Sequence, residues 1–208
     1  MGPLTVEAKQ VHRLLGLAML VPLLLWAGTG LIFLTKPGYD LAYEKLSPTL
    51  YRFDRAIHLE NPNNWAQVNI LRTILGYHLL VLDDDTWTHL DPFTLKVKPQ
   101  PTSDEIAALV ADAIVGREAR YGAVTHSEGF TVFTDTGVVI KLDWDTLSLQ
   151  QRGADTRLID SLYRIHYLQW SGSDNVNRLL GFLGLALLSA LTLLGLSTYV
   201  TGRRRDQA

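Results

Sequence analysis

Two long runs of apolar, uncharged residues lie near the ends of the chain and enclose a middle stretch of mixed polarity. Residues 14–34 form a run of 21 positions without a charge, and residues 179–200 form one of 22. A helix rises about 1.5 Å per residue, so each run would span about 30 Å, the thickness of the hydrocarbon layer of a membrane. The pattern therefore predicts two transmembrane helices, at residues 14–34 and 178–201.

Two other interpretations of these runs fit the sequence less well. As buried helices of a globular protein they would need covering, and about 140 residues cannot cover both and also form a core. As a secretory signal peptide the first run is too long, and no small-x-small cleavage site follows Leu34. We therefore expect the first run to be an uncleaved anchor.

Basic residues flank the two runs mainly on the sides of the chain termini. Lys9 and Arg13 precede the first run, and three consecutive arginines, at 203–205, follow the second. On the other side the flanking cations are Lys36 and Arg178. The positive-inside rule then predicts cytoplasmic termini and a periplasmic or otherwise extracytoplasmic middle domain. The expected location is the bacterial inner (plasma) membrane.

The middle stretch has the pattern of an α+β domain. Residues 104–115 have apolar positions at helical spacing, and Ser103 stands before them as an N-cap. Residues 130–142 form two short apolar segments around the turn 135–137, which predicts a β-hairpin. Residues 77–90 predict an earlier hairpin around the aspartates 83–85.

The two hairpins align without a gap at an offset of 52 residues (135 − 83). Each closes with the pattern Leu-Asp-x-x-Thr-Leu, beginning at Leu90 and at Leu142, and the aspartate can accept hydrogen bonds from turn amides. The alignment indicates an internal duplication, with repeats at 44–99 and 102–155. It also predicts a helix at 64–75 as the counterpart of the helix in the second copy.

These observations predict a membrane protein in which two transmembrane helices flank an extracytoplasmic α+β domain. The expected parts are a cytoplasmic N-terminus (1–13), a transmembrane helix (14–34), the domain (35–155), an interfacial helix and linker (156–177), a second transmembrane helix (178–201) and a cytoplasmic tail (202–208).

Composition then excludes several kinds of chemistry. The chain has 208 residues, a formal net charge of −2 and no cysteine. Without cysteine there are no disulfides, no thiolate-bound zinc, no iron–sulfur cluster and no covalent c-type haem. The charge balance gives no reason to expect nucleic acid as a partner. No Ser-His-Asp arrangement, H-E-x-x-H motif or phosphate-binding loop is present, which argues against hydrolase and nucleotide chemistry.

The order of these elements resembles a known family. A helix followed by a hairpin that closes on Leu-Asp-Trp-Asp-Thr-Leu (142–147) resembles the PepSY domain. The flanking runs resemble PepSY-associated transmembrane helices. The motifs on which this rests are the following: His12-Arg13-Leu14-Leu15-Gly16 at the start of the first run, Thr29-Gly30 near its end, His166 before the second run, Arg178 at its start and Gly195 towards its end.

The resemblance covers nearly the whole chain and implies a function. Larger members of this family resemble inner-membrane reductases that pass electrons across the membrane through b-type haems, some of them acting on ferric siderophores. They have about twice as many transmembrane helices, whereas this chain has one pair. The implied function is electron transfer through haem b, with iron or siderophore reduction as the reaction. The alternative is a non-catalytic accessory or assembly subunit whose domain binds a partner, so enzymatic activity stays open.

His12 and His166 are the candidate haem ligands among six histidines, because each adjoins one of the apolar runs. His166 lies in residues 160–170, where Leu162, Ile165 and Trp170 could share its face of an amphipathic helix. Neutral imidazole is the usual axial ligand of b-type haem. These two histidines lie near opposite faces of the membrane, so one chain cannot hold one haem between them.

Two chains could supply the missing ligands. A homodimer with its axis along the membrane normal would pair each histidine with its mate, and other membrane subunits could do the same. Membrane lipid and an unidentified small-molecule acceptor complete the expected partners. The competing interpretation is that both histidines anchor helices at the interface and bind nothing. His89 with Asp91, and His58 with Glu60, could bind a metal, although exposed polar residues on a strand are far commoner.

Overall fold

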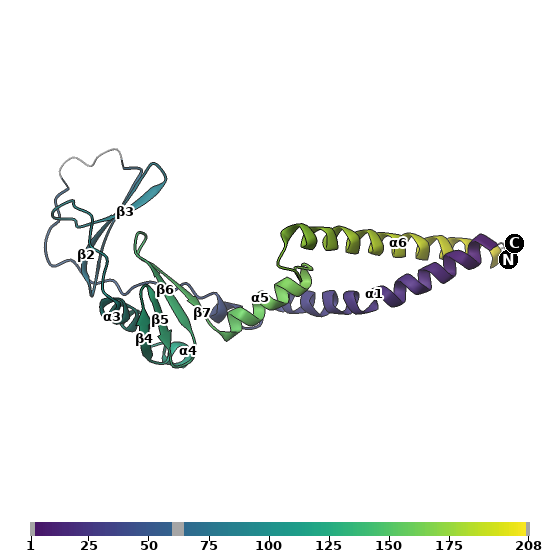
Figure 1. Ribbon diagram of the computed structural model, residues 1–208, viewed down its shortest axis with the longest axis horizontal. Helices are drawn as coiled ribbons and strands as arrows, with labels where there is room; N and C mark the ends of the chain where they lie inside the picture. Colours follow the sequence, from purple (N-terminus) through teal and green to yellow (C-terminus); the bar gives the residue numbers. More distant parts are fainter. Residues whose placement is uncertain (1–2, 60–64, 207–208) are drawn as a thin grey trace. The chain divides into compact units, whose positions relative to one another are not determined.

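The computed structural model describes the backbone of residues 3–59 and 65–206, and the side chains of residues 7–59 and 65–203 (Figure 1). The chain divides into two compact units, one formed by Met1–Pro37 with Leu158–Ala208 and the other by Gly38–Arg157. Two long apolar helices at the two ends of the chain thus flank an α+β region with two antiparallel sheets. This organisation agrees with the predicted fold class and is compatible with a membrane protein.

The first unit is built on the helices α1 (Pro3–Thr35) and α6 (Asp174–Asp206). They run antiparallel and side by side, with both chain termini at the same end of the pair (Figure 1). A Cβ atom on Gly16 would lie 3.7 Å from Leu191 Cδ1, an ordinary contact distance, so this position of α1 faces α6. The expected ends, 34 and 178, fall within one to four residues of the observed helix ends.

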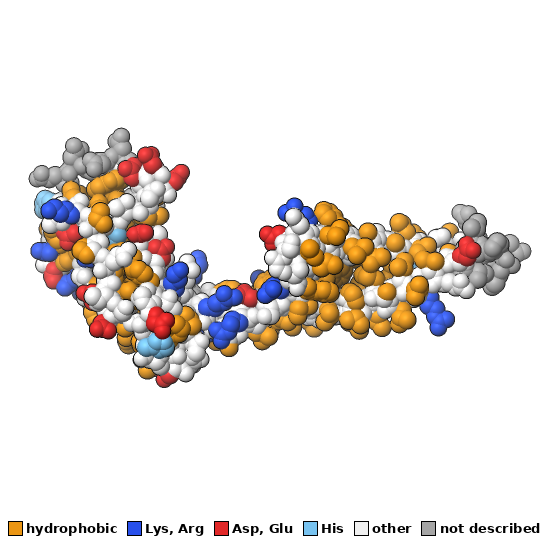
Figure 2. All heavy atoms as spheres, in the orientation of Figure 1, with side chains coloured by type: hydrophobic (Ala, Val, Ile, Leu, Met, Phe, Trp, Pro, Cys, Tyr) orange, Lys and Arg blue, Asp and Glu red, His pale blue; other side chains and the backbone are white. Residues whose placement is uncertain are grey.

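Most apolar side chains of this helix pair are exposed. Figure 2 shows hydrophobic side chains covering its visible face. The stretches Glu7–Thr35 and Asp174–Arg203 are long enough and apolar enough to cross a membrane, and few of their residues are buried within the structure. A core helix of a globular protein would be mostly buried, so the exposure favours lipid as the surrounding medium.

The helix α5 (Ala154–His166) precedes α6, and its residues from Leu158 onward belong to the first unit. It begins and ends earlier than the expected amphipathic helix at 160–170. The chain leaves the helix after His166, and Leu168 has a φ of 55°. Trp170 is therefore not on the same helical face as His166, and this part of the prediction is wrong.

The second unit contains two antiparallel meanders. The strands β1 (Gln67–Thr73), β2 (Gly76–Asp83) and β3 (Thr86–Leu90) form one sheet in that order. The strands β4 (Val124–Glu128), β5 (Thr131–Thr134), β6 (Val139–Asp143) and β7 (Ser148–Arg152) form the other. Three helices complete the unit: α2 (Tyr39–Ala42), α3 (Ser103–Ala113) and α4 (Glu118–Tyr121).

One hydrophobic core joins α3 to both sheets. Ile106 and Leu109 of α3 pack with Ile140 of the second sheet, and Leu80 of the first sheet belongs to the same cluster. These side chains are almost fully buried. The regularly spaced apolar residues that predicted α3 therefore lie on the face of the helix that packs against the sheets.

Two local predictions in this unit are wrong. The helix expected at 64–75 is the strand β1, which pairs with β2 from Gln67↔Leu82 to Thr73↔Gly76; residue 64 lies outside the described residues. Backbone pairing along the whole of β2 outweighs a weak helical pattern. The N-cap of α3 is Thr102 rather than Ser103, because Thr102 and Glu105 form a reciprocal capping box.

The closing turns of the two hairpins share one local structure, as the sequence predicted. Asp91 Oδ1 accepts hydrogen bonds from the N–H groups of Phe93 and Thr94, both at 2.9 Å. In the second copy, Asp143 Oδ1 accepts from the corresponding amides. The leucine that ends each motif has a left-handed backbone, with φ of 55° at Leu95 and 51° at Leu147. The common origin of the two repeats, 44–99 and 102–155, stays a prediction.

Candidate functional site

His12 lies on the side of α1 that contacts α6. Its Nδ1 is 3.1 Å from the carbonyl oxygen of Leu191, and a Cβ atom on Gly195 would lie 3.0 Å from its Cε1. A carbonyl oxygen can only accept a hydrogen bond, so Nδ1 carries the proton and donates. In the neutral ring Nε2 is then unprotonated, and among the described residues it has no hydrogen-bond partner.

His166, the last residue of α5, contacts α1 in the same way. Its Nδ1 is 2.8 Å from Thr29 Oγ1, and the single hydroxyl proton of Thr29 is directed to the carbonyl oxygen of Leu25 at 2.6 Å. The hydroxyl therefore accepts from His166 Nδ1–H, and Nε2 is again the unprotonated nitrogen. Phe33 meets the imidazole edge to face, with ring centroids 5.1 Å apart.

Each of these rings lies near a glycine. A Cβ atom on Gly195 would crowd the His12 ring, whereas a Cβ atom on Gly30 would lie 4.0 Å from His166 Cε1, an ordinary contact distance. Larger side chains there would displace the imidazoles, most of all at Gly195. The two hydrogen bonds also fasten α1 to α6 and to α5, so each histidine has a structural contribution of its own.

The arrangement has the form in which histidine binds metal ions. A ligating imidazole usually donates through one ring nitrogen to an oxygen acceptor, which fixes the tautomer and aims the other nitrogen at the metal. His12 and Thr29 are 17 residues apart on α1 (29 − 12), which is about 25 Å along the axis. The two histidines therefore cannot share one group, and each end of the helix pair offers one nitrogen.

A second pair of histidines lies in the second unit (Gly38–Arg157), called the central unit from here on, where no such pair was expected. His78 and His89 are 0% and 2% exposed, and His78 Nδ1 is 2.9 Å from His89 Nε2. His89 Nδ1 is 2.7 Å from the carbonyl oxygen of Trp144, which only accepts. This contact assigns the protons along the whole chain of hydrogen bonds. His78 donates to His89, and Thr73 Oγ1 donates to His78 Nε2 over 2.7 Å.

Both buried histidines are therefore neutral. Burial lowers the pKa of His78 to about 3, and the positive charge of Lys98, with that of His89 when protonated, adds to the effect. Burial also lowers the pKa of His89 to about 4, against an opposing hydrogen bond from its ring to the Trp144 carbonyl. All four ring nitrogens are engaged, so this pair joins the two sheets and offers no free ligand.

A signal for this pair was present in the sequence. The turn 84–85 sets the hairpin register at Leu80↔His89, and His78 lies two residues from Leu80, on the same face of the sheet. The two histidines are thus diagonal neighbours across the hairpin. The interpretation of His89 with Asp91 as a metal pair is wrong, since His89 is buried with both nitrogens bonded and Asp91 caps a turn.

The remaining histidines, His58 and His126, belong to the second unit. His126 stacks on Phe133 at 4.4 Å and is exposed, and His58 is exposed as well. Its suggested partner, Glu60, lies outside the described residues. Among the described residues no group of three or more His, Asp or Glu side chains could hold a metal ion.

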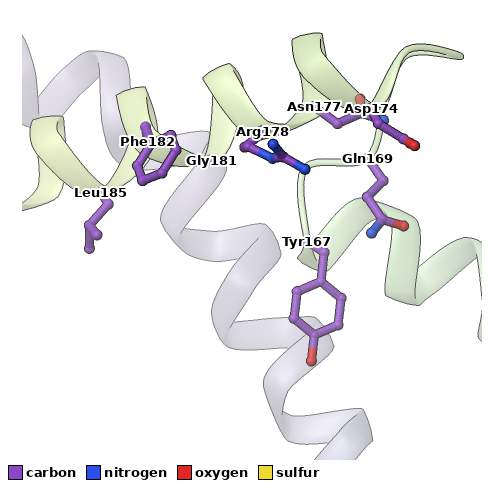
Figure 3. Close-up of a pocket in the computed structure, with 8 residues that line it drawn as sticks. All are labelled: Tyr167, Gln169, Asp174, Asn177, Arg178, Gly181, Phe182 and Leu185. Atoms are coloured by element: carbon purple, nitrogen blue, oxygen red, sulfur yellow. The ribbon is translucent and has the colours of Figure 1, made fainter.

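A groove of about 480 Å³ opens beside the start of α6 (Figure 3). Its lining residues change from polar to apolar along the helix. They are Tyr167, Gln169, Asp174, Asn177, Arg178, Gly181, Phe182 and Leu185.

Comparisons of this chain with protein-family models, with curated proteins and with solved structures give no match. The case for a function therefore rests on the residues and their geometry.

Proposed function

We propose that this chain is a membrane-anchored haem protein that passes electrons across the bacterial inner membrane as a two-chain assembly. The observation that carries the proposal is the shared state of His12 and His166. Each has Nδ1 within hydrogen-bond distance of an oxygen of α6 or α1, and each leaves Nε2 without a hydrogen-bond partner among the described residues. In this proposal, each end of the helix pair offers that second nitrogen to haem iron.

The placement in the membrane has its own support. The exposed apolar surfaces of α1 and α6 match the bilayer in length, and both termini lie at the same end of the pair (Figure 1). Lys9 and Arg13 precede the first apolar run and the arginines at 203–205 follow the second, so these basic residues lie towards the termini. We accordingly place the termini in the cytoplasm and the central unit on the extracytoplasmic side.

A second copy of the chain completes the sites in this proposal. Bis-histidine ligation needs two imidazoles facing each other, and each end of one helix pair supplies one. A two-fold axis along the membrane normal brings His12 opposite its mate and His166 opposite its mate. Gly195 beside His12 and Gly30 beside His166 have no side chains that would crowd the imidazoles.

Haem, when bound, supplies a one-electron carrier that works without proton transfer. The contribution of the chain is to hold each imidazole in one tautomer through Leu191 and Thr29, and to surround the site with apolar helix surface that excludes water. Reduction of iron or a ferric siderophore as the final reaction follows from the resemblance to PepSY membrane reductases alone.

The test is a reduced-minus-oxidised absorption spectrum of the full chain, purified from cells with adequate haem supply. Wild type should show the bands of a low-spin b-type haem. His166→Ala should remove the site near the α5 end and keep the other, and His12→Ala the reverse. His126→Ala is the matched control, because it removes an exposed histidine of the central unit and should leave the spectrum unchanged.

Thr29 gives a sharper form of this test. Thr29→Val removes the acceptor of His166 Nδ1–H at nearly constant volume, so the second site should lose haem or shift in its redox midpoint. Thr29→Ser keeps the hydroxyl and should behave as wild type. A colourless wild type that is folded and membrane-bound would reject the haem proposal and favour the accessory subunit that binds a partner through its extracytoplasmic unit.

A further inference from the structure

The groove beside the start of α6 has the chemistry of an amphiphile site. Asp174, Arg178 and Leu185 follow one another along one side of the helix, at intervals of four and seven residues. The charged residues thus come first and the apolar residues Phe182 and Leu185 follow, deeper in the uncharged run (Figure 3). A ligand seated here would have its polar end towards water and its apolar end along the helix.

The two charges of the groove are not paired with each other. No ion pair of Asp174 or Arg178 is found among the described residues, although their spacing on the helix would allow one. An arginine at the start of an uncharged run is costly to desolvate unless an anion meets it. The groove therefore presents one cationic and one anionic side chain, in a fixed order about 6 Å apart along the axis.

We propose that this groove binds phosphatidylethanolamine. Arg178 meets the phosphate, Asp174 accepts hydrogen bonds from the ammonium group one turn further out, and the acyl chains follow Phe182 and Leu185. Arginine matches phosphate through several N–H donors. A purely anionic headgroup would bring no partner for Asp174, and a choline headgroup has no N–H to donate to it.

Other residues fix the shape of the groove. Asn177 holds the preceding loop, because its Oδ1 accepts from Ser171 N–H at 2.9 Å and its Nδ2 donates to the Ser171 carbonyl oxygen at 3.0 Å. Tyr167 and Gln169, which precede Ser171 in the chain, line the groove and add hydrogen-bonding groups (Figure 3). At Gly181 a Cβ atom would meet nothing within 4 Å, so the missing side chain leaves the space open.

The proposal rests on the part of the proposed function that puts α6 across a membrane, and it does not require haem. The test uses the full chain in mild detergent, titrated separately with phosphatidylethanolamine, phosphatidylglycerol and phosphatidylcholine. Native mass spectrometry then counts the lipid molecules that stay bound. Wild type should bind phosphatidylethanolamine at the lowest concentration of the three.

Five variants, three in the groove and two controls, separate the contributions. Arg178→Gln should weaken binding of phosphatidylethanolamine and phosphatidylglycerol about tenfold, since one charged hydrogen-bonding group is lost. Asp174→Asn should weaken only phosphatidylethanolamine and should strengthen phosphatidylglycerol. Arg203→Gln and Gly202→Leu change the same helix at its far end, where Gly202 also has open space, and should bind as wild type.

Gly181→Leu fills the open space and should block all three lipids without straining the helix. Equal binding of the three lipids by wild type, or equal losses in Arg178→Gln and Arg203→Gln, would overturn the proposal. Carbonate extraction of membranes separates this failure from failure of the membrane placement, because a chain released by carbonate does not span the bilayer. The haem spectrum of Arg178→Gln should equal that of wild type, so loss of lipid binding can be measured separately from loss of haem.

Discussion

Among the individual residues, the hydrogen bonds of each histidine determine whether one of its ring nitrogens is free to bind a ligand. The hydrogen bonds that run from Thr73 through His78 and His89 to the Trp144 carbonyl use every ring nitrogen once. A further proton on His89 would set its Nε2–H against the Nδ1–H of His78 in a buried site, and one on His78 would place an uncompensated charge there. His12 and His166 differ, because one nitrogen of each ring is left without a partner among the described residues.

The buried pair predicts how stability depends on pH. The pKa of His78 is about 3 and that of His89 about 4 in the folded protein, against about 6.5 in the unfolded chain. Between these values the unfolded state binds more protons, so stability falls as the pH is lowered. We expect constant stability above about pH 6.5 from this pair, and a loss of several kcal/mol by about pH 4.

The charges around the pair modify this slope only in part. Lys98, whose Nζ donates to the Tyr77 carbonyl at 2.7 Å, opposes protonation of both rings, and Asp145 favours protonation of His89. The measurement is the urea midpoint of the full chain in mild detergent from pH 8 to about pH 4. His78→Gln should be less stable at neutral pH and should show a shallower decline. An equal slope in wild type and variant would contradict the assignment.

The sequence could locate the histidines of the helix unit but not their partners. His12 and His166 are placed near the two apolar runs by counting residues alone. Their hydrogen bonds to Leu191 and Thr29 join segments more than 130 residues apart, and no local pattern carries that information. Burial of His89 was missed for the same reason, because it depends on Trp144, in the turn between β6 and β7.

At the scale of elements, local chemistry predicted the turns better than the helix ends. Asp91 and Asp143 were expected to accept from turn amides, and both do. That interaction lies within three residues, so the sequence determines it. The strand β1 was missed because its structure depends on pairing with β2, which outweighs its own weak preference.

The start of α3 separates two adjacent hydroxyl residues. Thr102 Oγ1 accepts from Glu105 N–H at 3.3 Å, and Glu105 Oε2 accepts from Thr102 N–H at 2.8 Å. Thr102→Ala should therefore lower the free energy of unfolding by about 1 kcal/mol. Ser103→Ala is the matched control and should change it by less than about 0.5 kcal/mol. Urea unfolding of both variants measures this, and a larger loss in Ser103→Ala would restore the sequence-based cap.

At the scale of the whole molecule, the proposed orientation predicts where each part meets water. An alkaline phosphatase reporter, active only in the periplasm, should be inactive when fused after Ala208 and active when inserted after Pro99. The reason is the excess of basic residues beside the termini. A cytoplasmic reporter at the same two positions provides the control and should give the opposite pattern. Activity of the periplasmic reporter after Ala208 would reverse the orientation.

In the proposed assembly, two chains together hold haem between paired histidines at each end of the helix pair. The most direct measurement is the ratio of haem to polypeptide, by pyridine haemochrome and amino-acid analysis, in a detergent-purified dimer. We expect one haem per chain in wild type, half as much in His12→Ala or His166→Ala, and none in the double variant. A folded wild type without haem, or single variants that keep the full ratio, would contradict it.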